Sequence, residues 1–301
     1  MKWGIVFTST NFPGPAQAAA LGEAAEEAGF DCLCAPEHIV IPLEYKPLYE
    51  ATASGRMEQL ERQGVPDPLI WFTYVAAKTR TLKFLSGVML LTERNPLHTA
   101  KEAATLAVLS EGRLMLGVGS GWCREEYEAL GVSWPNRGRR LDEYIEVCRT
   151  LWRDPIASYK GEFVNFDRLY SDPKPPAGYV PIHIGGRSEA AARRGGRVGD
   201  GYFPAVFPTS DVPTLFPKLV RWMREGAQEA GRNPDAIELT SGGVRTAEGA
   251  KWFADLGVHR LTIAPHAKDL AGMREELKRF GGEVIDKTRD LGPPLPAPAS
   301  A

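Results

Sequence analysis

The chain contains 301 residues, of which 43% are hydrophobic and 25% are charged. These proportions are typical of a folded globular protein and exclude a long disordered or collagen-like chain. Lys and Arg number 36 against 38 Asp and Glu, a formal net charge of -2, so the charge balance favours neither nucleic acid nor an anionic membrane surface as a partner.

Short apolar runs recur along the chain, and each is followed by a segment of helical period. Runs without alternating polarity are typical of parallel strands that helices cover on both faces. The predicted strands are 2–7, 31–35, 81–90, 114–119, 181–185, 200–204, 236–240 and 259–264. The predicted helices are 15–29, 68–79, 97–110, 122–153, 188–198, 211–230, 246–256 and 269–286.

Eight strand–helix units place the chain in the α/β class and predict a (β/α)8 TIM barrel. The strand at 236–240 is short, which leaves an open doubly wound sheet as the alternative. We expect residues 1–290 to form one barrel domain. The Pro-rich tail at 291–301 is expected to be disordered, because proline has no backbone N–H to donate to a helix or a β-sheet.

Two insertions interrupt this rhythm. Residues 39–67, after the second strand, are too long for an ordinary connection. At the C-terminal mouth of a barrel, such a segment is expected to act as a lid or substrate loop. Residues 154–180, before the fifth barrel strand, contain an alternating piece that predicts a small hairpin turned at Lys160 and Gly161.

Targeting and redox signals are absent from the sequence pattern. The first residues lack the apolar core of a signal peptide, and no apolar stretch approaches the ~20 residues that span a bilayer. The four cysteines form no C-x-x-C pair. We therefore expect a cytoplasmic protein that acts on a small molecule.

His38 is the foremost candidate for acid–base chemistry. It follows Glu37 at the end of the predicted strand 31–35 and precedes the long insertion. An imidazole titrates near neutral pH, and a neighbouring carboxylate can tune it; a purely structural histidine is the alternative. The histidines form no H-x-H pair or cluster, so no metal site is predicted.

Gly185, Gly186, Arg187 and Ser188 open a predicted helix. Glycines let a ligand approach the backbone, a serine can cap the helix, and the free N–H groups of the first turn bind anions. A phosphate at this helix start is therefore reasonable, and Arg187 would add positive charge. A plain glycine turn with a capped helix is the alternative.

Glycines at two further places, the run 117–121 and Gly87, suggest that a ligand or another strand comes close to the backbone there. The run at 117–121 has the spacing G-x-G-x-G, which does not match the dinucleotide-binding fingerprint. Small residues such as Gly119 and Ser120 would still let a flat ring lie against the backbone. Gly87 interrupts the third predicted strand, which indicates either a bulge or a close approach.

Four segments carry a family resemblance: AEEAGFDCLCAPEHIVIP (25–42), RNPLHTAKEAATLAVLSEGRLMLGVGSGWCREEYEALG (94–131), RGRRLDEYIEVCRTLW (137–152) and PIHIGGRSEAAARRGGRVGDGYFP (181–204). In this order they resemble the luciferase-like monooxygenase superfamily, specifically its coenzyme F420-dependent oxidoreductase branch. The resemblance covers about residues 1–270. It implies a (β/α)8 barrel that binds F420 or FMN at its mouth, and relatives commonly form homodimers.

The resemblance also implies positions for the cofactor. The ring would lie near residues 86–88, where relatives have a bulge with a non-prolyl cis peptide, and the phosphate would lie at the double glycine. An arginine after the double glycine favours the more acidic tail of F420. The residues expected to bind the cofactor are Thr8, Ser86, Gly87, Val88, Gly119, Ser120, Gly185, Gly186, Arg187, Ser188, Asp200, Gly201 and Tyr202.

The activity implied is hydride transfer between the deazaflavin C5 and a small organic substrate. His38 would exchange the proton, and Glu37 would set its charge. Tyr45, Tyr49 and Trp122 would form an aromatic substrate wall. An FMN-dependent monooxygenase that uses O2 and a separate reductase is one alternative, and a flavin-binding protein without catalysis is another.

Overall fold

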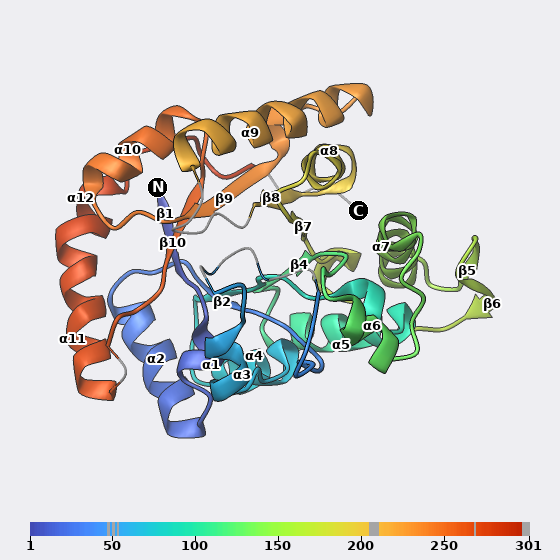
Figure 1. Ribbon diagram of the computed structural model, residues 1–301, viewed down its shortest axis with the longest axis horizontal. Coiled ribbons are helices and arrows are strands. Elements are labelled where there is room, and N and C mark those ends of the chain that lie inside the picture. The colour runs from blue at the N-terminus through green and yellow to red at the C-terminus, as the bar shows by residue number, and fades with distance from the viewer. Residues whose placement is uncertain (47–48, 50–51, 53, 205–210, 268, 297–301) are drawn as a thin grey trace.

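The computed structural model describes residues 1–46, 49, 52, 54–204, 211–267 and 269–296. Its centre is a closed barrel of eight parallel strands (Figure 1). In chain order these are β1 (Lys2–Ile5), β2 (Cys32–Ala35), β3 (Lys83–Ser86), β4 (Leu114–Val118), β7 (Ile182–Gly185), β8 (Gly201–Phe203), β9 (Glu238–Gly242) and β10 (Arg260–Ile263). Each strand pairs with the next, and β10 pairs with β1, which confirms the predicted (β/α)8 barrel.

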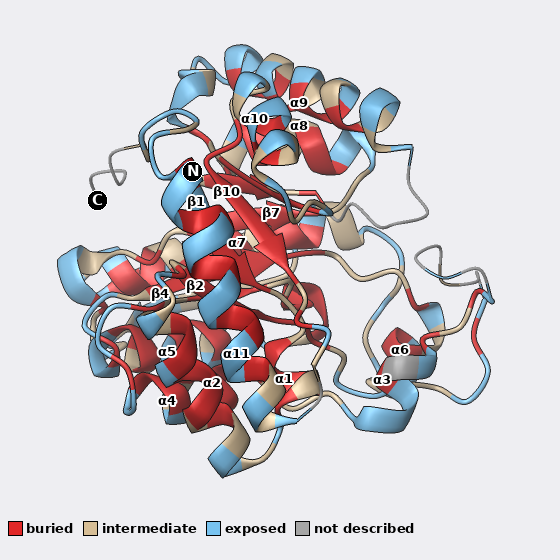
Figure 2. Cartoon of the chain, turned by 90° about the vertical axis from the view of Figure 1, so that its left-hand side faces the viewer, coloured by how far each residue is buried: buried red, intermediate tan, exposed pale blue. Residues whose placement is uncertain are grey.

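Helices surround the barrel, with buried inner and exposed outer faces (Figure 2). The long ones are α2 (Pro15–Glu27), α4 (Pro68–Ala76), α5 (Pro96–Leu109), α7 (Arg137–Arg153), α8 (Glu189–Val198), α9 (Val212–Glu229), α10 (Ala247–Asp255) and α11 (Leu270–Phe280). The short ones are α1 (Thr8–Asn11), α3 (Glu58–Gln63), α6 (Arg124–Ala129), α12 (Asp286–Thr288), the 3₁₀ turns η1 (Leu91–Glu93), η2 (Pro176–Gly178) and η3 (Pro234–Ala236), and the π-helical turn η4 (Gly281–Ile285). Asp67, Asn95 and Ser188 each cap the helix that follows with a side-chain oxygen.

Two predicted elements are corrected. The third strand, predicted over 81–90, ends at Ser86, and the chain rejoins the sheet through a single bridge between Met89 and Val118. The helix predicted over 122–153 is two helices, α6 and α7. Gly131 and Asn136 adopt positive φ between them, which ends one helix and redirects the chain before the next.

The two predicted insertions are present. The strands β5 (Ala157–Lys160) and β6 (Asn165–Leu169) form an antiparallel hairpin that projects beyond α7 (Figure 1). The insertion at 39–67 contains α3, and several of its residues, at 47–48, 50–51 and 53, lie outside the described part of the chain. The predicted disordered tail lies outside it from residue 297 onward.

A buried ionic network closes the N-terminal end of the barrel. The Arg260 side chain, on β10, has no exposed surface. Its Nε and Nη2 donate to Asp31 Oδ2 at 2.9 and 2.7 Å, and its Nη1 donates to Glu238 Oε1. The N-terminal end of the barrel is therefore filled by charged side chains. The chemistry is expected at the opposite, C-terminal end.

Across the described residues, no helix combines the length and the apolar character needed to cross a membrane.

Candidate active site

The floor of the barrel mouth is built where β3 ends. The peptide bond between Gly87 and Val88 is cis. The Val88 side chain lies over two neighbouring strand ends, because a Cβ added to Gly119 or Gly185 would come within 2.9 or 2.4 Å of its methyl groups. Because Gly119 and Gly185 have no side chain, the Val88 side chain fits between them. The structure thus brings together four of the predicted cofactor residues from β3, β4 and β7.

Backbone hydrogen bonds hold this floor against β4. Met89 N donates to Gly117 O at 2.8 Å, and Gly119 N donates to Met89 O at 2.9 Å. The Ser86 hydroxyl also donates to Gly117 O, at 2.8 Å. Ser86, predicted to bind the cofactor, therefore uses its hydroxyl to join β3 to β4.

Replacing Gly117 by alanine is expected to lower the free energy of unfolding by at least about 1–3 kcal/mol. The new Cβ would lie 1.9 Å from the Ser86 carbonyl oxygen, so β3 and β4 would have to separate. Urea unfolding measures the loss. Gly282→Ala is the matched control because its Cβ would meet nothing within 4 Å; equal stability of the two variants would contradict the expectation.

The double glycine forms a turn at the N-terminus of α8. Gly186 has φ of +111°, a conformation that glycine tolerates and other residues rarely adopt. Ser188 Oγ accepts the backbone N–H of Ala191 at 3.2 Å. Tyr202, fully buried, donates its hydroxyl to Gly186 O at 2.8 Å and so supports the turn from behind. A helix N-terminus opened by such a turn is able to bind an anion through its first-turn N–H groups.

The structure corrects the positions expected for Asp200 and Gly201. The strand β8 begins at Gly201, so these residues start the strand and lie at the end of the barrel away from the mouth. Asp200 Oδ2 accepts the backbone N–H of Ile182, at the start of β7, at 2.8 Å. Thr8 is fully buried, and its hydroxyl donates to Cys34 O at 2.9 Å. These three residues support the barrel in this structure.

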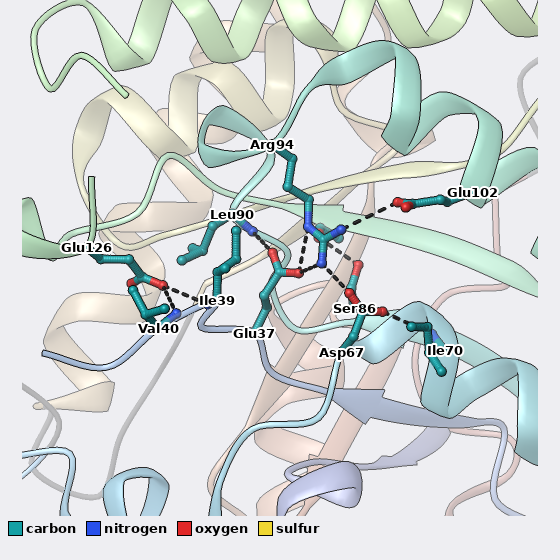
Figure 3. A network of polar contacts seen from close by, with 11 residues as sticks. Glu37, Ile39, Val40, Asp67, Ile70, Ser86, Leu90, Arg94, Glu102 and Glu126 are labelled. Atoms are coloured by element: carbon teal, nitrogen blue, oxygen red, sulfur yellow. Dashed lines mark hydrogen bonds and ion pairs between the residues drawn. The ribbon is translucent and has the colours of Figure 1, made fainter. Parts of the chain in front are cut away.

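His38 is held by Glu126, a residue of α6. The distance between His38 Nδ1 and Glu126 Oε2 is 2.7 Å, and both side chains are largely or fully buried. Glu126 Oε1 also accepts the backbone N–H groups of Ile39 and Val40, at 2.7 and 3.2 Å (Figure 3). Because a carboxylate only accepts, Nδ1 carries the proton of this bond. Nε2 is then the ring nitrogen that can exchange a proton.

Glu37 has a different partner from the one predicted. Its carboxylate accepts Arg94 Nε at 2.8 Å and the backbone N–H of Leu90 at 2.6 Å (Figure 3). Arg94 also pairs with Asp67, at the N-terminus of α4. Burial raises the pKa of Glu37 and the charge of Arg94 opposes that rise. Glu37 therefore joins the ends of β2 and β3, and the carboxylate that directly contacts His38 is that of Glu126.

The three aromatic residues predicted to line the substrate pocket lie together, and one of them, Trp122, lies beside His38. The Trp122 ring lies 6.2 Å from the His38 ring, 5.6 Å from Tyr45 and 5.2 Å from Tyr49, between centroids. Tyr45 is buried, and its hydroxyl donates to Glu61 at 2.7 Å. Burial raises the pKa of Tyr49, while the positive charge of Arg187 lowers it. The insertion and the double-glycine turn are thus close enough to interact electrostatically.

Two cavities adjoin these groups. One of about 320 Å³ opens at the barrel mouth and includes Gly87, Phe203 and Arg245 in its lining. The other, of about 370 Å³, lies along the insertion and includes His38 and Arg56. Among the described residues, no group of three or more His, Cys, Asp or Glu side chains is arranged to hold a metal ion.

Sequence reasoning missed Glu126 and Arg94. Both follow barrel strands at the mouth, Glu126 after β4 and Arg94 after β3. The rule that functional residues gather at the C-terminal ends of barrel strands was the available signal. It could not pair them with His38 and Glu37, which lie 88 and 57 positions away in the sequence.

Residues 1–249 match the protein family described as luciferase-like monooxygenase. The chain belongs to this family. An uncharacterised protein of Mycobacterium tuberculosis is 32% identical to it over 276 residues, which cover 89% of this chain and 94% of that protein. The F420-dependent glucose-6-phosphate dehydrogenase of Nakamurella multipartita is 31% identical over 247 residues, covering 79% of this chain and 65% of that enzyme.

Solved structures show the same fold. A monooxygenase of Streptomyces bottropensis superposes with a TM-score of 0.74 at 19% identity, covering 95% of this chain and 99% of that one. The F420-dependent tetrahydromethanopterin reductase of Methanopyrus kandleri gives 0.72 at 17% identity, covering 95% and 98%. The relatives of this luciferase-like chain thus include both F420-dependent enzymes and monooxygenases.

Proposed function

We propose that this chain is an F420-dependent oxidoreductase that transfers a hydride between the deazaflavin C5 and a small organic substrate. The observation that carries the proposal is the buried His38–Glu126 pair beside a glycine-lined barrel mouth. It combines a titratable proton carrier with a surface on which a flat ring can lie. The F420-dependent relatives support the same choice of cofactor.

The residues at the mouth fit a flavin-like cofactor. The cofactor, when bound, supplies the hydride-transfer chemistry of its ring. Val88, Gly119 and Gly185 would support the ring, since larger residues at the two glycines would collide with Val88. The α8 N-terminus, opened by Gly186 and Ser188, would hold the phosphate. All of these come from adjacent strand ends.

Arg187 supports F420 over FMN. It stands at the start of α8, so its positive charge adds to that of the helix N-terminus. The F420 tail carries a phosphodiester and carboxylates, whereas FMN ends at its phosphate. A guanidinium beyond the phosphate position would therefore contact charge that only the longer tail provides.

His38 would move the proton that accompanies the hydride. Glu126 fixes the imidazole through Nδ1, which leaves Nε2 to give a proton to the reduced substrate or to take one in the reverse direction. The same carboxylate holds the backbone of Ile39 and Val40, so the start of the insertion and the imidazole are positioned together. The aromatic side chains beside His38 would exclude water from the reacting atoms.

Titration of the purified protein with F420 and, separately, with FMN tests the choice of cofactor through cofactor fluorescence. We expect saturable binding of F420 and much weaker binding of FMN. Arg187→Ala is expected to weaken F420 binding by about tenfold and FMN binding by less, because one charge-assisted contact to the tail is lost. Tight binding of FMN alone would overturn the F420 assignment.

An FMN-dependent monooxygenase is the second candidate, and the structural similarity to a monooxygenase favours it. The two candidates differ in their need for oxygen. Reduced FMN would cause oxygen consumption by a monooxygenase, whereas oxidation of reduced F420 by the proposed enzyme depends on an organic acceptor and proceeds without oxygen. Cofactor binding without turnover in either assay would favour the non-catalytic alternative.

A further inference from the structure

Glu93 is a buried carboxyl group that the proposed reaction does not use. It ends the turn η1, which is separated from the end of β3 by four residues, and only 5% of its surface is exposed. Neither carboxyl oxygen accepts a hydrogen bond from a donor among the described residues, and the carboxyl group within hydrogen-bond reach is that of Glu126. One oxygen lies against Gly121, where an added Cβ would come within 2.4 Å of it. The carboxyl group is therefore closely packed, and no cation in the described part of the chain is paired with it.

The groups that face Glu93 are mainly acidic. Glu126 of α6 and Glu37 after β2 both bring negative charge close to it. Burial first, and then these two carboxylates, raise the pKa of Glu93 to about 9. Arg94, the next residue in the sequence, is engaged by Glu37 and Asp67. The neighbouring Tyr127 hydroxyl is within reach of Thr92 and Ser120 O, and burial raises its pKa to about 12.

Two adjacent carboxyl groups in a buried site cannot both be ionised without a large cost. Glu126 has three donors: the His38 ring and two backbone N–H groups. Glu93 has none among the described residues. The negative charge therefore belongs on Glu126, and the proton belongs on Glu93.

We propose that Glu93 is a positioning residue for His38. In this role the Glu93 carboxyl group is neutral and donates a hydrogen bond to the Glu126 carboxylate. The Glu93–Glu126 pair then carries a single negative charge behind the imidazole. With that one charge, His38 can alternate between neutral and protonated forms. A second charge would hold the proton on His38 and oppose its release. The positioning role rests on the proposed function, whereas the neutral state of Glu93 does not.

Carboxyl ¹³C NMR of the protein without cofactor tests the neutral state. We expect one glutamate carboxyl signal to titrate near pH 9 in the unmodified protein and to be missing in Glu93→Gln. The His38 ring signal should move in the same step, and that movement should also be missing in the variant. Glu128→Gln is the matched control, because Glu128 lies on the same helix as Glu126 but is exposed. Titration of Glu93 near pH 4–5, its ordinary range, would overturn the proposal.

Turnover against pH tests the positioning role. Glu93→Ala removes the donor to Glu126 and is expected to lower kcat about tenfold at pH 7. Glu93→Gln, which keeps an N–H donor, should restore most of that loss and remove the change in kcat centred near pH 9. A pH profile of Glu93→Gln identical to that of the unmodified enzyme would contradict the role.

The two failures are distinguishable. If the protein does not oxidise reduced F420 with any acceptor, the proposed function fails while the NMR titration still reports on Glu93. If turnover occurs and no carboxyl titrates near pH 9, only the inference about Glu93 fails. Should Glu93→Gln not fold, the titration of the unmodified protein, with Glu93 assigned through its side-chain carbons, decides the question.

Discussion

Arg260→Leu is expected to lower the free energy of unfolding by about 3–5 kcal/mol at pH 7, because two largely buried carboxylates lose their guanidinium and, among the described residues, only Asp31 keeps a second paired cation, Lys83 at 3.9 Å. Asp31 and Glu238 both lose the guanidinium that holds them, in a site where Arg260 itself is fully buried. Urea unfolding measures the loss. The leucine fills most of the vacated volume, so the effect reports on charge more than on packing.

The loss should depend on pH, and its sign follows from the carboxyl groups. Burial would raise the pKa of Asp31 and of Glu238, but the Arg260 charge outweighs it and both pKa values are lowered. Both groups therefore stabilise the fold above their unfolded pKa, and this contribution is lost as the pH falls through the folded values. Without Arg260 the burial effect is less opposed and the two pKa values rise, so the difference from the unmodified protein should shrink as the pH falls from the variant's raised pKa values to the lowered values of the unmodified protein.

Arg289→Leu is the control for this experiment. Arg289 also pairs with an aspartate, Asp286 at 2.7 Å, but both side chains are more than half exposed. Such a pair contributes about 0–1 kcal/mol. An Arg260→Leu variant no less stable than Arg289→Leu would show that the buried network does not stabilise the barrel.

His38→Asn is expected to lower kcat with reduced F420 and substrate by about 10²–10⁴-fold, the usual contribution of a general acid or base. Asparagine retains an N–H donor for Glu126 but carries no proton that it can exchange near neutral pH. Affinity for F420 should change little, because the proposed cofactor contacts come from the glycine-lined floor and α8. Single-turnover oxidation of bound reduced F420 separates the chemical step from binding.

His98→Asn serves as the matched control, since His98 is exposed near the start of α5 and is not one of the groups that contact Glu126. It should retain full turnover. Full turnover of His38→Asn with a bound substrate would show that another group carries the proton.

The barrel was predictable because its signals are local. Each buried strand is a short apolar run, and each following helix has its own apolar face. The failures occurred where tertiary contacts override that pattern. Residues 87–90 continue the apolar run of β3, yet Gly87 and Val88 turn away from the sheet to cover Gly119 and Gly185. Nothing in the local hydrophobicity marks that departure.

The candidate site was predictable in its location and only partly in its contacts. His38 stands at a strand end, as predicted, but the choice of Glu37 as its partner followed sequence adjacency. Successive residues in an extended chain point in opposite directions, so Glu37 reaches Arg94 while His38 reaches Glu126. Asp200 was misplaced for another reason: the family resemblance put it at the mouth, although it precedes β8 and therefore lies at the start of that strand, the end of the barrel away from the mouth.

The insertion is attached to a neighbouring segment. Buried Tyr45, Met57 and Leu60 pack with Cys123, which lies at the start of α6, into a small apolar cluster of their own. Glu126 of the same helix holds the first residues of the insertion. A chimera that grafts residues 39–67 from a relative onto this barrel should therefore exchange α6 as well. If the insertion is grafted alone, its apolar residues will not fit Cys123 and its first residues will not fit Glu126. Because Glu126 also holds the His38 ring, His38 would then be displaced.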